Sequence, residues 1–183
     1  ITIPPSVTTI EEDAFYDNLF LTAVYISDIE AWCKISFGAN PLANIQNGNS
    51  GNLYLNGELV TELVIPEGVT YIGKDTFYGC RSITTVTLPE SVAGIGTDAF
   101  SNCWNLTSIN IPEGVAEIGE GVFFRCLNLT SITIPKSVAK IGDHAFYYCS
   151  SLTTITISEN SRLTNIGYEA FIYCRNFIDD NAN

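Results

Sequence analysis

The chain has 183 residues and is 46% hydrophobic, which is enough to form one sizeable core. Acidic residues outnumber basic residues by 20 to 8, and the formal net charge is −12. Binding to phosphate backbones or to anionic lipid requires clustered lysine and arginine, so we expect no nucleic-acid partner. No apolar run approaches the roughly 20 residues needed to span a bilayer, so we expect no membrane insertion by this chain.

The chain opens within a repeated pattern. Residues 1–7, ITIPPSV, match the middle of a unit that recurs later, and the sequence contains no methionine. We therefore expect residues 1–183 to form a single repeat domain that is a fragment of a longer protein.

Residues 27–64 interrupt the pattern and are expected to form a variant unit. Ser27-Asp28-Ile29-Glu30 matches a capping box with Ser27 as the N-cap, which predicts a short helix over DIEAWCKI. Residues 38–51 are rich in asparagine and glycine and predict a loop. Residues 53–60, LYLNGELV, alternate apolar residues around Asn56-Gly57, which predicts a hairpin with a type I′ turn.

Two aromatic residues of this variant unit, Trp32 and Tyr54, have two interpretations. Large aromatic side chains are mostly buried, so Trp32 and Phe37 can simply complete the local core. Alternatively, the unit protrudes and presents Trp32 or Tyr54 to a ligand.

Residues 65–157 form regular 23-residue repeats without slippage, in the form L-x-x-I-x-I-P-x-x-V-x-x-I-G-x-x-A-F-x-x-C. Ile109 and Ile111 are two positions apart, which is the spacing of a strand, and Pro112 then ends the strand by removing a backbone donor. The period is too short for two helices. It suits one turn of a flattened coil, with a strand on one side and a tight return on the other.

A single such turn cannot bury its own apolar edge, so the turns are expected to stack and share a core. Equivalent positions in successive turns then lie about 4.8 Å apart and form columns along the stack. The most prominent column consists of Phe15, Phe77, Phe100, Phe123, Phe146 and Phe171. The sequence thus predicts a mainly-β repeat solenoid: a right-handed coil of about seven turns, with a continuous parallel sheet on one face and tight return turns on the other.

The last unit, residues 158–183, is slightly extended. Ser158 replaces the usual proline, and two extra residues precede Ile166. Lengthening a loop costs little, so we expect a small loop on the return side.

Most of the cysteines occupy the same position in successive repeats, and their spacing is not that of a metal-binding motif. Five of the six occupy one position of the repeat: Cys80, Cys103, Cys126, Cys149 and Cys174. Five equivalent positions cannot all pair, and a buried thiol behaves as a small hydrophobe, so we expect reduced, buried cysteines. The sequence has no Cys-x-x-Cys pair and its one histidine, His144, lies in a different column, so we expect no metal and no cofactor.

No catalytic residue can be named. His144 lies at a position occupied elsewhere by Thr76, Asp98, Gly121 and Glu169 or their neighbours, which indicates a freely varied, solvated position. Neither G-x-S-x-G nor H-E-x-x-H occurs, and no nucleophile, base and metal set converges. The sequence therefore favours a protein that is not an enzyme.

The repeated units 82–103, 105–126 and 128–149 resemble the BspA-like, or treponemal-type, leucine-rich repeats of bacterial surface proteins. The variant unit also has counterparts in that family, in its W-x-x-I-x-F, NPL and LYLNGELV segments. The resemblance implies a leucine-rich-repeat solenoid in an extracellular or bacterial cell-surface protein that serves adhesion or host interaction. It does not imply one ligand.

The outward residues of successive strands are the candidate ligand-binding site, because solenoids bind through extended sheets. These sheet-face residues are Tyr25, Thr85, Thr87, Ser108, Asn110, Ser131, Thr133, Thr154 and Thr156. Trp32 and Tyr54 are the alternative second contact, and the column of Tyr78, Phe124 and Tyr147 is a further candidate on the rim. Threonine is also simply a good strand residue, so this face can equally serve only to keep the sheet solvated.

Three functions remain open. The leading hypothesis is an adhesive interaction module with a protein or glycan ligand, host extracellular matrix included. The alternative is a passive structural spacer, or stalk, that presents other domains. A glycan-processing enzyme is the third, although no pair of acids stands out.

Overall fold

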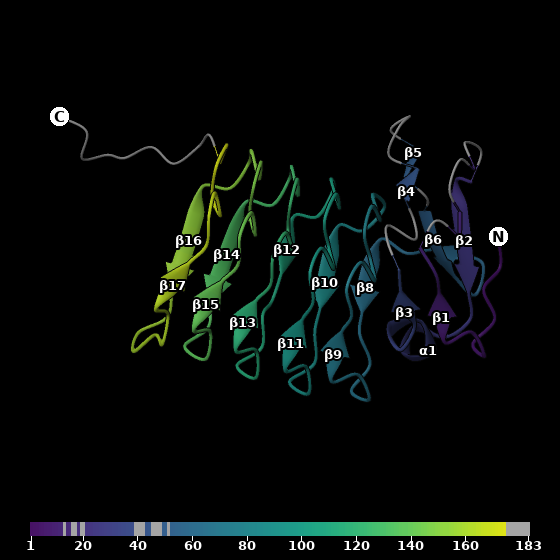
Figure 1. The fold of residues 1–183 in the computed structure, drawn as a ribbon, viewed down its shortest axis with the longest axis horizontal. Coiled ribbons are helices and arrows are strands. Elements are labelled where there is room, and N and C mark those ends of the chain that lie inside the picture. The colour runs from purple at the N-terminus through teal and green to yellow at the C-terminus, as the bar shows by residue number, and fades with distance from the viewer. Residues whose placement is uncertain are drawn as a thin grey trace.

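The computed structural model describes residues 1–12, 14–15, 18, 21–38, 43–44, 49–50 and 52–174. Within these residues the chain forms short strands joined by turns, which wind into a solenoid of about six turns. Figure 1 shows the coils side by side along the long axis of the molecule. The mainly-β repeat solenoid is confirmed, and the prediction of about seven turns is one too high.

Each regular coil contributes one strand to a front row and one to a return row (Figure 1). The front strands are β2 (Ala23–Ile26), β6 (Asn52–Leu55), β7 (Glu58–Leu59), β8 (Glu62–Val64), β10 (Thr85–Thr87), β12 (Ser108–Ile109), β14 (Ser131–Ile134) and β16 (Thr154–Ile157). The return strands are β1 (Thr9–Ile10), β3 (Ser36–Phe37), β9 (Tyr71–Ile72), β11 (Gly94–Ile95), β13 (Glu117–Ile118), β15 (Lys140–Ile141) and β17 (Asn165–Ile166). We call the solvent-exposed sides of these two rows the front face and the return face.

The strand register reproduces the sequence period. Thr85 pairs with Ser108, and the adjacent hydrogen bond between Thr107 and Thr84 spans the same 23 residues. In the last unit Asn165 pairs with Lys140, and the adjacent bond between Thr164 and Ala139 spans 25 residues. The two extra residues therefore lengthen the loop before β17, as predicted. Where the other units have proline, the Ser158 N–H donates a 3.1 Å hydrogen bond to the Ile134 carbonyl, which proline could not make.

Neither row of strands has the sheet structure that the sequence predicts. The front strands form separate hydrogen-bonded sheets, in the orders β12-β10-β8 and β14-β16, so the predicted continuity is wrong. β12 ends at Ile109, and the side chain of the next residue, Asn110, bonds Leu88 of the preceding coil. The return side, in contrast, contains a five-stranded parallel sheet, β17-β15-β13-β11-β9, where the sequence predicts only turns.

The phenylalanine column forms the centre of the core. Phe77, Phe100, Phe123 and Phe146 are fully buried, and successive rings from Phe77 to Phe171 stack at centroid distances of 5.1 to 6.0 Å. Phe15 and Phe171 are partly buried and pack against the same core. Burial of large aromatic rings supplies much of the free energy that holds the coils together.

Two positions in each regular coil adopt positive φ, where the chain turns from the return strand into the core. One column contains Asp75, Asp98, Gly121, His144 and Glu169, and the other contains Gly79, Asn102, Arg125, Tyr148 and Tyr173. For any residue other than glycine, this left-handed backbone conformation is unfavourable in free energy. Backbone bonds between coils hold it in place: the Asp98 N–H donates to the Glu120 carbonyl at 2.9 Å.

Several polar side chains also join one coil to the next by donating to a backbone carbonyl of the preceding coil. The Thr107 hydroxyl donates to the Thr84 carbonyl at 2.9 Å, and the Asn128 amide donates to the Trp104 carbonyl at 2.9 Å. The Ser137 hydroxyl donates to the Val115 carbonyl at 2.7 Å. In each case the donor side chain lies one coil later in the chain than the backbone carbonyl that accepts.

The variant unit contains the predicted helix, with a different cap. Helix α1 spans Ile29–Cys33, and the Asp28 carboxylate accepts the Ala31 N–H at 3.0 Å. The N-cap is therefore Asp28, and the prediction of Ser27 is wrong by one residue. Glu30 does not reach back to a cap, because it pairs with Lys34 at 2.7 Å.

The hairpin that follows is confirmed. β6 and β7 pair antiparallel with Tyr54 opposite Leu59, and both turn residues, Asn56 and Gly57, have positive φ. Upstream, β4 (Ala43–Asn44) and β5 (Asn49–Ser50) also pair antiparallel, so the prediction of a loop over 38–51 is wrong at those residues. Residues 39–42, 45–48 and 51 lie outside the described part of the chain.

Candidate functional site

The structure places the sheet-face residues on the front face. Tyr25 lies in β2, Thr85 and Thr87 in β10, Ser108 in β12, Asn110 directly after it, Ser131 and Thr133 in β14, and Thr154 and Thr156 in β16. All are exposed except Thr85, which is half-buried. The serines and threonines follow one another in register along adjacent coils. Their role in binding a ligand stays a prediction.

Asn110 has a structural role that the sequence did not reveal. Its side-chain oxygen accepts the Leu88 N–H at 3.1 Å, and its side-chain nitrogen donates to the Leu88 carbonyl at 3.3 Å. The amide group therefore replaces a pair of backbone bonds at the end of β10. This residue is a poor position at which to test ligand binding, because its loss would also disturb the coil.

Tyr25 and Tyr54 form an aromatic pair on the front face. They lie opposite one another in the parallel pairing of β2 with β6, and their rings stack at 4.7 Å. Tyr25 is 39% exposed and Tyr54 is half-buried. Tyr54 thus extends the front face next to Tyr25 and does not form a separate contact element.

Trp32 belongs to the core. It is 2% exposed, its ring lies 5.0 Å from the Phe37 ring, and its indole N–H donates to the Thr76 carbonyl at 3.0 Å. The interpretation of Trp32 and Phe37 as core residues is confirmed. The alternative, in which Trp32 contacts a ligand, is wrong because its side chain has almost no accessible surface.

The cysteine column is reduced and buried, as predicted. The Cys126 thiol donates to the Phe100 carbonyl at 3.2 Å. Cys103, Cys149 and Cys174 make the equivalent bond, each to the phenylalanine carbonyl of the preceding coil. Burial raises the pKa of Cys103 to about 12, so its sulfur stays a neutral thiol rather than a nucleophilic thiolate. Within the described residues, no group of three or more His, Cys, Asp or Glu side chains is placed to hold a metal ion.

The position of His144 is not the freely varied one that the sequence predicts. It aligns with Asp75, not Thr76, and every member of its column has positive φ. The choice of residue there is therefore limited by the backbone as well as by solvent exposure. His144 Nε2 lies 3.4 Å from a Glu169 carboxylate oxygen, and its ring contacts Tyr147 and Tyr168 edge-on.

The same column contains a perturbed carboxyl group, Asp98. Partial burial raises its pKa to about 6, and the negative charges of Asp75 and Glu120 add to this effect. A hydrogen bond from Ser101 and the charge of Lys74 oppose it. Asp98 borders a hollow of about 380 Å³, which Tyr78 and Phe124 also line. Tyr78 is buried, so its predicted exposure on the rim is wrong, while Phe124 and Tyr147 are half-buried.

We expect Asp98→Asn to stabilise the protein at neutral pH. The carboxyl pKa is about 6 when folded and 3.8 in its reference state, so the native state binds the proton more tightly. Stability therefore falls as pH rises from about 4 to about 6 and stays lower above that range. Because Asp98 is only partly buried, water screens this penalty to about 1–2 kcal/mol.

Asparagine removes the charge and tolerates positive φ. Denaturant unfolding at pH 7.5 should show the gain, and unfolding at pH 3.5 should show almost none. An equal gain at both values would contradict the electrostatic explanation.

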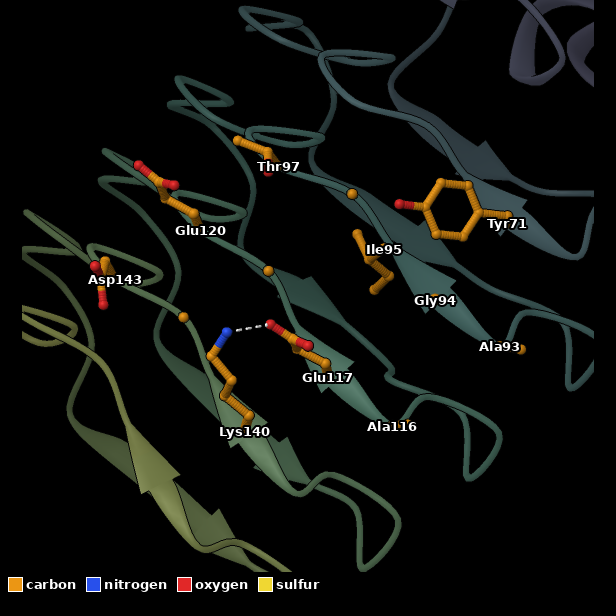
Figure 2. Close-up of a pocket in the computed structure, with 13 residues that line it drawn as sticks. Tyr71, Ala93, Gly94, Ile95, Thr97, Ala116, Glu117, Glu120, Lys140 and Asp143 are labelled. Carbon is orange, nitrogen blue, oxygen red and sulfur yellow. Dashed lines mark hydrogen bonds and ion pairs between the residues drawn. The ribbon is translucent and has the colours of Figure 1, made fainter.

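The return face contains a groove that the sequence analysis missed (Figure 2). It has a volume of about 450 Å³ and runs across β9, β11, β13 and β15. Tyr71 forms one wall, and the ion pair of Glu117 with Lys140, at 2.8 Å, forms the other. Gly94 lies between these walls in the same outward row, and its missing side chain leaves the space over which the Tyr71 ring lies.

The signal for this groove was present in the repeat. Tyr71, Gly94, Glu117 and Lys140 are spaced by the repeat period and therefore share a column. The return side was predicted to consist of turns, and turns do not indicate that this column points outward from a sheet.

Solved structures of bacterial proteins have a similar fold. A leucine-rich repeat protein from T. pallidum is 33% identical, with a TM-score of 0.61, over 64% of this chain and 56% of that one. A leucine rich cell surface protein from Faecalibacterium prausnitzii is 28% identical, with a TM-score of 0.58, over 90% of this chain and 52% of that one.

The pneumococcal vaccine antigen PcpA shares the fold at 19% identity, with a TM-score of 0.59, over 93% of this chain and 54% of that one. This chain thus spans about half the length of these proteins. A comparison with curated protein sequences finds no match. Among the described residues, no helix has the length and apolar character needed to cross a membrane.

The family described as the BspA type leucine rich repeat region matches residues 1–52 and 50–178, in six copies. The match covers the regular coils, the variant unit and the extended last unit. Together with the regular strand register and the stacked phenylalanine column, it shows that the chain belongs to the BspA-type leucine-rich repeat family.

Proposed function

We infer that this chain is a non-enzymatic interaction module of a bacterial cell-surface or secreted protein, and that it makes an adhesive contact with a host or microbial protein through its front face. The observation that carries the proposal is the register-locked array of exposed serine and threonine side chains on adjacent coils. The likeness to a leucine rich cell surface protein supports the location. Host extracellular matrix is the first class of ligand to test.

The front face suits a protein ligand because it is preorganised. Its strands are fixed by backbone bonds to their neighbours, so binding costs little conformational entropy. Hydroxyl groups offer both donors and acceptors, and the stacked pair of Tyr25 and Tyr54 supplies the aromatic surface that binding hot spots need. With a net charge of −12, the chain favours a ligand with a neutral or basic surface.

The test compares two triple lysine variants in binding to immobilised fibronectin, laminin and collagen. Ser108→Lys, Ser131→Lys and Thr133→Lys alter exposed positions on the front face. The matched control, Thr8→Lys, Thr9→Lys and Ser36→Lys, adds the same charge at exposed positions in and beside β1 and β3. We expect the front-face variant to lose at least about tenfold in affinity and the control to bind like the parent.

Circular dichroism should show that both variants remain folded. Equal binding by the two variants would place the contact elsewhere. No binding by the folded parent protein would favour the passive spacer.

A further inference from the structure

We propose that the return-face groove is a saccharide-binding site, separate from the front face, in which the Tyr71 ring stacks on the apolar face of a neutral sugar ring and the Glu117–Lys140 pair binds its hydroxyls. The groove, its walls and its floor all belong to regular coils of the solenoid (Figure 2). The proposal does not depend on an adhesive role for the front face.

The Tyr71 ring is held in position by two glycines, with one of its edges against Gly94. A Cβ atom at Gly94 would lie 2.9 Å from Cε2 and 3.0 Å from Cδ2 of Tyr71, so the ring rests against the Gly94 backbone. A Cβ atom at Gly96 would lie 3.0 Å from the Tyr71 hydroxyl oxygen. The two glycines thus allow the ring to lie across β11, and the side that does not touch them is open, since Tyr71 is 54% exposed.

Such a ring suits a sugar. The face of an aromatic ring is electron-rich and attracts the slightly positive C–H groups on one face of a pyranose. Tyrosine loses little side-chain entropy on binding when its position is already fixed.

The opposite wall supplies charged hydrogen-bonding groups. Glu117 and Lys140 are each 50% exposed at the side chain, so they can bind a ligand while paired with one another. A carboxylate accepts from hydroxyls and an ammonium donates to them, and hydrogen bonds with a charged partner are stronger than neutral ones. The Tyr71 ring lies over β11, one strand spacing of roughly 5 Å from β13, so a sugar on its exposed face is within reach of the Glu117 and Lys140 side chains.

The groove fits a sugar better than the other ligand classes. Its volume of about 450 Å³ lies in the usual range of small-molecule sites. The acidic side chains Glu120 and Asp143 make an anion unfavourable, because Lys140 is already paired with Glu117. An uncharged, hydroxyl-rich molecule with one apolar face can stack on the Tyr71 wall and form hydrogen bonds with the Glu117–Lys140 wall.

The experiment is a titration of the isotope-labelled chain with methyl glycosides of glucose, galactose, mannose and N-acetylglucosamine, followed by amide chemical shifts. We expect saturable binding in the millimolar range by at least one glycoside, with shifts centred on Gly94, Gly96 and Glu117. Tyr71→Ala should weaken that binding at least about tenfold, and Tyr71→Phe, which keeps the ring, should stay within about threefold of the parent.

The control variant is Tyr173→Ala, which removes an exposed tyrosine that belongs neither to the groove nor to the front face and should leave glycoside binding unchanged. Thermal unfolding of each variant checks that the coils are intact. The proposal fails if no glycoside gives saturable shifts, if Tyr71→Ala binds like the parent, or if a tetralysine peptide shifts these amides and no sugar does. A loss of matrix-protein binding in the front-face lysine variant has no bearing on these results, so the two proposals can fail separately.

Discussion

Phe123→Ala is expected to lower the free energy of unfolding by about 3–5 kcal/mol. Phe123 is fully buried and lies between the rings of Phe100, at 6.0 Å, and Phe146, at 5.2 Å. Truncation removes the stacking partner of two rings at once. The space cannot close, because the Phe123 N–H bonds the Ala145 carbonyl at 2.8 Å and fixes the distance between coils.

Equilibrium unfolding in guanidinium chloride, read by far-ultraviolet circular dichroism, measures this loss. Phe124→Ala is the matched control, since Phe124 is the next residue, is half-buried and, among the described residues, stacks on the single ring of Tyr147 at 5.0 Å. We expect the control to lose about 1–2 kcal/mol. Equal losses for the two variants would show that the phenylalanine column is not the main source of cohesion between coils.

Gly142→Ala should cost about 3 kcal/mol, which is large for the addition of one methyl group. A Cβ atom there would lie 2.6 Å from the Glu120 nitrogen and 2.6 Å from the Gly119 carbonyl carbon. Both are backbone atoms of the preceding coil. The clash can be relieved only if the two coils move apart, and that movement stretches the pairing of β13 with β15.

The matched control for this variant is Gly94→Ala, one of the glycines below the Tyr71 ring. Its added Cβ meets only ring atoms of a half-exposed side chain, at 2.9 Å, and that side chain can rotate away. Thermal melts should therefore show a much smaller loss for Gly94→Ala than for Gly142→Ala. A similar loss for both would mean that close backbone approach does not set the spacing of the coils.

The sequence predicted the parts of the fold that a fixed period determines. Because Phe100 and Phe123 are one period apart and the strands pair at the same interval, columns in the sequence become columns in space. The same logic correctly predicted the buried thiols and the two-residue extension before β17.

It was less successful where a single side chain changes the local bonding. Asn110 binds the backbone of Leu88 and directly follows β12, and nothing in the period distinguishes it from Thr133, which remains in a strand. Asp28 and Ser27 are both good caps, and only the geometry around Ala31 decides between them. The return strands are two residues long, too short to show an alternating pattern, so the outward direction of the column with Tyr71 and Gly94 was missed.

The side-chain hydrogen bonds that donate to the preceding coil suit assembly of the stack from its N-terminal end. Thr107, Asn128 and Cys126 each donate to a carbonyl of the coil before their own. When a coil leaves the ribosome, these side chains therefore find their acceptors already in place, in a coil made earlier. Folding from the N-terminal end can advance one repeat at a time, and none of these side-chain donors needs to wait for a partner that has yet to be synthesised.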